Sequence, residues 1–171
     1  MTRDTKLSEE EEEREEIPLS KAAQYLLEEC RMVLPGIQAL FGFQLIAVFN
    51  AGFREKVGPV GEQLHLVAMA LVVIAVALVM TPAAYHRQTR PREVSERFIT
   101  VSTRLLLFSM LPLALAICLD FYIVGRVLVE GAVIPSLTAV LFGLFVVLWI
   151  VLPRSARLKR LIGGRRREVA G

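Results

Sequence analysis

The chain has 171 residues, of which 54% are hydrophobic and 22% are charged, and its formal net charge is +3. The charged residues gather at the two ends and in short clusters, which leaves four long apolar stretches. A soluble domain of this size has no core large enough to surround four helices that are apolar on all sides, so we expect an all-α integral membrane bundle. No nucleic-acid-binding motif accompanies the basic residues, and we expect no nucleic acid partner.

The sequence offers few residues that could take part in catalysis or bind a metal or cofactor. Cys30 and Cys118 have neither a disulfide framework nor metal-ligand spacing. The sequence has no glycine-rich phosphate loop and none of the common hydrolase motifs. We therefore expect no enzymatic activity, no cofactor and no bound metal.

The chain begins with a strongly acidic segment, in which Glu9 to Glu13 stand in a row. Such a run repels itself and buries nothing, so residues 1–18 are expected to form a disordered leader. From Leu19 to Cys30, apolar residues recur at helical spacing. This pattern predicts a short amphipathic helix, which lies either on the membrane surface or against the bundle.

The first predicted span covers residues 33–53, with Pro35 in its first turn, where the missing N–H costs little. It carries three amide side chains at intervals of six residues, Gln38, Gln44 and Asn50. Side chains at that spacing point in different directions around a helix, so we expect this span to be the most central. Its amides either pack between helices or contribute to an intramembrane polar or ion site.

The second predicted span, residues 64–81, follows a short loop at 54–63 and contains no charged residue. Its length corresponds to a rise of about 27 Å, close to the hydrocarbon thickness of a bilayer. Pro82 is expected to end the helix, and a basic segment beginning with His86 and Arg87 marks the water side. The uniform apolarity suits this span to face lipid.

The third and fourth predicted spans, 105–124 and 132–152, are joined by a short loop. Each carries a stripe of small and polar residues at helical spacing. Small faces let helices approach closely in lipid, so we expect the two spans to pair as a tight hairpin. The stripes are Ser109, Pro112, Ala116 and Asp120 in the third span and Ala132, Ser136, Ala139 and Gly143 in the fourth.

Asp120 is the only acidic residue within a predicted span, which makes it the first candidate for an intramembrane site. As a proton or cation site it would need burial and a path for water. As a structural residue it would need only a polar partner near the same membrane face. The partners expected there are Asn50, Arg54, Lys56 and Arg126.

At the opposite face, charged residues from several helices are expected at one level. A salt-bridged collar there would hold the first span against the second and third. Its predicted members are Glu28, Glu29, Arg31, His86, Arg87 and Arg104.

Lysine and arginine are distributed unequally between the predicted loops. Seventeen lie in the N-terminal segment, the loop between spans two and three and the C-terminal tail, against three in the other two loops. The positive-inside rule then predicts that both termini face the cytoplasm. The basic tail, residues 154–171, is expected to contact anionic lipid headgroups.

Two motifs carry a resemblance to a known family. They are Glu29-x-Arg31 followed by Leu34-Pro35-Gly36-Ile37-Gln38-x-Leu40-Phe41-x-Phe43, and Pro82-x-x-Tyr85-His86-Arg87. Over about residues 20–152 the chain resembles an uncharacterised bacterial family of small four-span membrane proteins, classed as a domain of unknown function. Some members of that family carry a sodium:proton antiporter name. The resemblance implies four spans and the bacterial cytoplasmic membrane, and it supplies no catalytic residues.

The sequence therefore predicts one membrane domain over residues 19–153. The favoured function is a non-enzymatic accessory or scaffold protein that acts through packing, lipid contact, a second copy of itself or a membrane partner. The alternative is a small proton- or cation-coupled transporter that resembles a sodium:proton antiporter. Such a transporter would act as an oligomer, because four spans seldom enclose a pathway alone.

Overall fold

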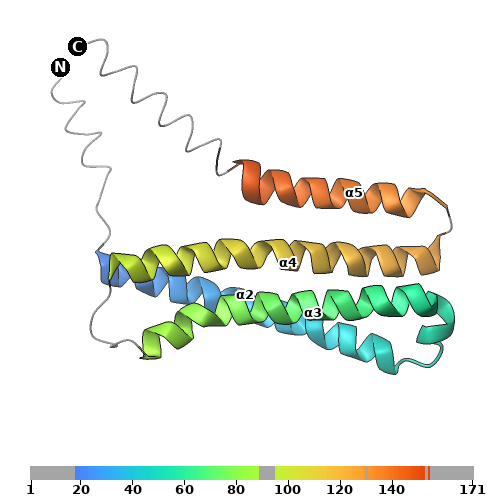
Figure 1. Cartoon of the computed structure of the whole chain (residues 1–171), viewed down its shortest axis with the longest axis horizontal. Coiled ribbons are helices and arrows are strands. Elements are labelled where there is room, and N and C mark those ends of the chain that lie inside the picture. The colour runs from blue at the N-terminus through green and yellow to red at the C-terminus, as the bar shows by residue number, and fades with distance from the viewer. Residues whose placement is uncertain (1–17, 89–94, 130, 153, 155–171) are drawn as a thin grey trace, which may run out of the picture.

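The computed structural model describes residues 18–88, 95–129, 131–152 and 154. Figure 1 shows the helices lying side by side along the long axis of the molecule. Within the described residues, four helices are long and apolar enough to cross a membrane, as predicted for an all-α membrane bundle. They are α2 (Leu19–Phe49), α3 (Phe53–Gln88), α4 (Glu96–Leu128) and α5 (Val133–Val146), which the π-helix η1 (Val147–Val151) extends.

α2 begins directly after Pro18 and continues through Pro35 without a break. The amphipathic segment predicted ahead of the first span thus forms the first turns of the same helix. Three residues of its stripe, Ala23, Leu26 and Cys30, are buried against the bundle, whereas Leu19 at its start is exposed. The remainder of the acidic leader and the basic tail beyond Arg154 lie outside the described residues.

α3 has boundaries that differ from those predicted for the second span. The expected loop at 54–63 is helical on both sides of Gly58, whose φ of 66° and ψ of 176° interrupt the helix. Pro82 does not end the helix, which continues to Gln88. A proline removes one backbone hydrogen bond, whereas a broken helix would expose several polar backbone groups to hydrocarbon, so continuation is favoured.

The core lies between α3 and α4, which pack along most of their length, with α2 against both. The buried face of α3 repeats at alternating intervals of four and three residues, which is typical of left-handed helix packing. The prediction that the first span is central and the second faces lipid is therefore wrong. The residues of this α3 seam are Gly61, His65, Ala68, Val72, Ala75, Val79 and Pro82.

α4 and α5 are neighbours, but not through the two predicted stripes. Ala116 of the α4 stripe packs in the core with residues of α2 and α3, while the stripe of α5 is exposed. The close approach is at Gly125, where an added Cβ would lie 2.7 Å from Cγ2 of Ile134. The predicted hairpin is wrong in its contact face, because Asp120 on the α4 stripe finds its polar partners on α2 and α3.

Candidate functional site

Three polar side chains from three helices meet inside the bundle: Gln44 of α2, His65 of α3 and Asp120 of α4. We call them the polar cluster. Nε2 of Gln44 donates a hydrogen bond to Oδ2 of Asp120 at 2.7 Å. Nε2 of His65 lies 3.0 Å from the backbone carbonyl oxygen of Gln44, and its Nδ1 lies 3.6 Å from Oδ1 of Asp120. Gln44 and His65 are buried, and the side chain of Asp120 is 19% exposed.

The polar cluster lies inside the helical bundle rather than at the ends of the helices. Asp120 precedes the end of α4 at Leu128 by about two helical turns, a rise of about 12 Å. Phe53 packs edge-on against the His65 ring, with the centroids 5.1 Å apart. The imidazole is thus enclosed by an aromatic ring, a carbonyl oxygen and a carboxylate.

The prediction that Asp120 bonds to a polar residue at the nearby membrane face is wrong. Arg54 instead pairs with Glu62, Nε to Oε1, at 3.1 Å. Arg126 donates from Nη1 to the carbonyl oxygen of Gly131 at 3.1 Å. All the predicted partners occupy exposed positions nearer the helix ends than Asp120: Asn50, Arg54, Lys56 and Arg126.

The structure brings only two of the four predicted intramembrane residues together. Gln44 and Asp120 come together, whereas Gln38 and Asn50 lie elsewhere. Gln38 lines a cavity between the middle of α2 and the last turns of α3. Asn50 follows the last residue of α2, and its carbonyl oxygen accepts a hydrogen bond from the backbone N–H of Phe53 at 3.1 Å.

The predicted salt-bridged collar is not formed within the described ranges. Glu28 accepts a hydrogen bond from Nε2 of Gln24 at 3.1 Å, and three other members line the cavity that contains Gln38. Exposed charges gain little from pairing, because water already solvates them well. No ion pair joins the described side chains of Glu28, Glu29, Arg31, His86, Arg87 and Arg104.

Sequence analysis did not select His65, although the sequence contains a signal for it. The histidine lies on the same face of α3 as Gly61, Ala68 and Val72, in the seam described above. A seam of small residues marks the face that a neighbouring helix approaches. A histidine within that seam therefore points toward a helix rather than toward water.

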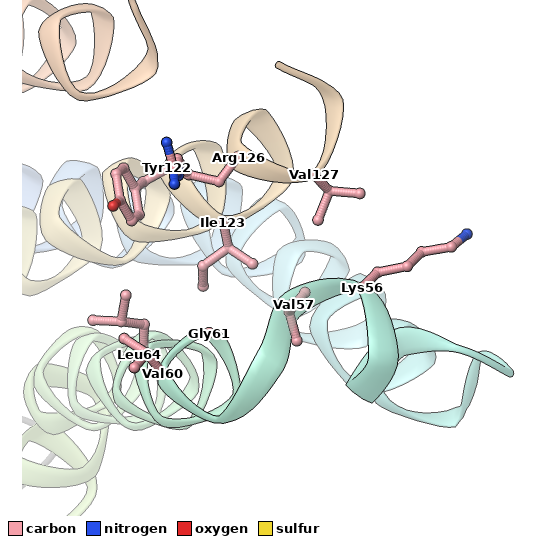
Figure 2. A pocket seen from close by; sticks show the side chains of 9 residues that line it. All are labelled: Lys56, Val57, Val60, Gly61, Leu64, Tyr122, Ile123, Arg126 and Val127. Carbon is pink, nitrogen blue, oxygen red and sulfur yellow. The ribbon is translucent and has the colours of Figure 1, made fainter. Parts of the chain in front are cut away.

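Two cavities lie at the end of the bundle where α2 turns into α3, and neither is lined by a member of the polar cluster. One, of about 220 Å³, lies beside Phe53 between the end of α2 and the end of α4. The other, of about 250 Å³, reaches Gly61, one helical turn from His65. Figure 2 shows its lining, which is Lys56, Val57, Val60, Gly61, Leu64, Tyr122, Ile123, Arg126 and Val127.

Beyond the polar cluster, toward the other end of the bundle, the core is mainly apolar. The hydroxyl groups of Ser102 and Ser109 on α4 are buried there, beside hydrophobic side chains from α2, α3 and α4. This apolar layer consists of Leu26, Cys30, Ile37, Val72, Val79 and Ala116. The polar cluster thus has cavity space within about one helical turn on one side and a mainly apolar core on the other.

The geometry of the polar cluster favours one retained proton. A carbonyl oxygen only accepts, so Nε2 of His65 carries a hydrogen. Nδ1 then faces a carboxyl oxygen of Asp120, and two unprotonated acceptors would repel each other. The contact between His65 and Asp120 is favourable as imidazolium with carboxylate or as imidazole with carboxylic acid.

In the part of the chain that the structure describes, no three His, Cys, Asp or Glu side chains group as metal ligands.

Comparison with known proteins gives one match. No curated protein and no solved structure matches the chain. A family model matches residues 9–153, a range that includes α2, α3, α4 and α5 and most of the sequence. This four-span chain therefore belongs to DUF6328, a family of unknown function.

Proposed function

We propose that the protein is a non-enzymatic membrane protein that acts by binding a proton at the polar cluster. The observation that carries the proposal is the position of His65, with one ring nitrogen donating to a carbonyl oxygen and the other facing Asp120. Ionisable groups buried among membrane helices are costly and are typical of proton relays. A pair that holds one proton between two groups can release and rebind it.

Gln44 supports a functional rather than a purely structural network. Its Oε1 is buried and has no hydrogen-bond partner among the described residues. An unpaired buried acceptor costs about 1–3 kcal/mol. A hydrogen-bond network that serves only to join helices is most stable when every polar atom in it is paired. The unpaired Oε1 of Gln44 therefore favours a site whose hydrogen bonds change during function.

The surroundings favour proton exchange with one side of the membrane. The cavity that reaches Gly61 supports entry from the end where α2 turns into α3. The apolar layer on the other side opposes exit there. Transport across the membrane would therefore require a second conformation in which that layer opens.

Two versions of this function differ in whether the proton crosses the membrane. In the first, the protein is a small proton-coupled transporter that exchanges a cation for the proton, as an oligomer. In the second, it is an accessory protein whose packing responds to proton binding. The exposed stripe of α5 favours the second version, because it leaves a small-residue face for a second copy or a membrane partner.

Proton binding is tested first, on the full-length protein in liposomes. Infrared difference spectra between about pH 5 and pH 8 should show a carboxylic acid band that disappears in Asp120→Asn. Ser109→Ala is the matched control, since Ser109 is buried on the same α4 stripe and bonds only to the carbonyl oxygen of Leu106. Identical difference spectra for the protein and Asp120→Asn would remove the proposal.

Flux then separates the two versions. A pH-sensitive dye is enclosed in the liposomes, and sodium or potassium is added outside. Cation-dependent proton flux that is lost in Asp120→Asn and kept in Ser109→Ala identifies a transporter. Proton binding without flux identifies the accessory version.

We also propose that both termini face the cytoplasm of a bacterial cell. Support comes from the excess of lysine and arginine in the terminal segments and in the loop between α3 and α4. In this orientation, the cavities beside the polar cluster open toward the outer face of the cytoplasmic membrane.

A further inference from the structure

A separate cavity of about 500 Å³ lies between the middle of α2 and the last turns of α3. Its size is within the range of sites that bind small molecules and lipids, about 300–1,000 Å³. It lies at the opposite end of α3 from His65, so it is independent of the polar cluster. Its walls are mainly apolar, with Leu27, Leu34 and Pro35 from α2 and Val79, Met80 and Ala83 from α3.

The shape of α3 explains why space remains there. Figure 1 shows the last turns of α3 turning away from the line of the rest of the helix. Pro82 lies within these last turns, where a proline removes a backbone hydrogen bond and favours a kink. Met80, on the cavity wall, is 46% exposed, so the cavity also opens sideways, where a membrane helix meets lipid.

The polar part of the lining carries positive charge. Arg31 and Arg87 are exposed at the cavity, and His86 and the amide of Gln38 lie beside them. Within the described residues, no acidic side chain pairs with either arginine, and no acidic side chain lines the cavity. The cavity thus combines unneutralised cations with an apolar interior.

We propose that this cavity binds an anionic amphiphile with a phosphate headgroup, the class to which anionic phospholipids belong. The phosphate lies at Arg31 and Arg87, whose planar guanidinium groups match phosphate oxygens. One acyl chain lies against Leu34, Val79 and Met80. Basic pockets between membrane helices recognise such headgroups. The apolar walls favour a lipid over free phosphate, which has nothing to place against them.

The test measures lipid binding to the full-length protein in neutral detergent by native mass spectrometry. Phosphatidylglycerol is titrated against phosphatidylcholine. Phosphatidylglycerol should bind at least about tenfold more tightly, and Arg31→Gln/Arg87→Gln should remove at least about tenfold of that affinity. Equal binding of the two lipids to the unmodified protein would overturn the proposal.

A charge-matched control distinguishes lipid binding in the cavity from general electrostatic attraction of lipid to the protein surface. Arg97 and Arg104 are exposed on the first turns of α4 and do not line the cavity. Arg97→Gln/Arg104→Gln should change the affinity by less than about twofold. An equal loss in the two double variants would show surface attraction alone and overturn the site. Inorganic phosphate that displaces the lipid completely would show a free-anion site and overturn the lipid assignment.

A second variant tests the apolar part with all charges kept. Ala83→Leu places a larger side chain in the cavity wall and should weaken phosphatidylglycerol binding by about tenfold. Unchanged binding in this variant would overturn the placement of the acyl chain. Circular dichroism and thermal unfolding of each variant verify folding, and Ala83→Leu carries the test if the double arginine variant does not fold.

Discussion

Asp120 and His65 face each other across the interface of the central helix pair, with Oδ1 of the carboxyl group 3.6 Å from Nδ1 of the imidazole. Gln44 joins α2 to this pair through its 2.7 Å hydrogen bond to Asp120. The three long helices are therefore linked at one level by an amide, an imidazole and a carboxyl group. Changes at Asp120 act on the packing of all three.

A comparison of Asp120→Asn with Asp120→Leu should distinguish the contribution of hydrogen bonding to stability from that of charge. Asparagine can accept from Gln44 and donate to Nδ1 of His65, so we expect its free energy of unfolding to stay within about 1 kcal/mol of the unmodified protein. Leucine leaves both partners unpaired and should cost about 1–3 kcal/mol. Thermal unfolding in detergent, followed by circular dichroism, measures both. An asparagine variant as unstable as the leucine variant would show that the charge itself holds the helices.

Gly125 and Ile134 should show a steric coupling between α4 and α5. Gly125→Ala places a Cβ 2.7 Å from Cγ2 of Ile134, so we expect a loss of about 1–3 kcal/mol from overpacking. Ile134→Ala removes the obstructing atoms, and the double variant should recover about 1 kcal/mol of the summed losses. The chain's one tryptophan, Trp149, lies on η1 and reports the separation of α5 by its fluorescence.

Gly143→Ala is the control for that cycle. Nothing lies within 4 Å of a Cβ added there. The change should be neutral or stabilise the helix by up to about 1 kcal/mol. Additive losses from Gly125→Ala and Ile134→Ala would contradict the close approach of the two helices.

Gly58 should resist substitution because of its backbone conformation. Its φ of 66° and ψ of 176° lie in a region that essentially only glycine adopts. We expect Gly58→Ala to cost about 1–3 kcal/mol in thermal unfolding. Gly36→Ala, within α2 and with open space around an added Cβ, should cost nothing. Equal behaviour of the two variants would argue against the interruption of α3.

The predicted orientation has its own test. A reporter enzyme that is active only outside the cytoplasm, fused after Gly171, should be inactive in a bacterial host. The same reporter placed at Gly52, in the turn between α2 and α3, should be active. The reverse pattern would invert the topology and place the polar cluster nearer the cytoplasmic side.

The sequence was sufficient to predict the four spans and the helical class. Insertion of a segment into a bilayer depends on the sum of the transfer free energies of its own residues, which is a local property. Residues 64–81 and Asp120 accordingly lie within two of the helices that are long and apolar enough to cross a membrane. Local signals failed at Pro35 and Pro82, because in hydrocarbon the backbone must keep its remaining hydrogen bonds and the helix continues.

The tertiary structure alone decided which polar groups meet. Asp120 had several candidate partners by membrane depth, and depth says nothing about how each helix is rotated about its axis. The seam on α3 fixes the rotation of that helix, because α4 packs closely against it. His65 lies within the seam and therefore faces the carboxyl group of Asp120. The partner of Asp120 therefore depends on the packing of three helices together, which a single span does not encode.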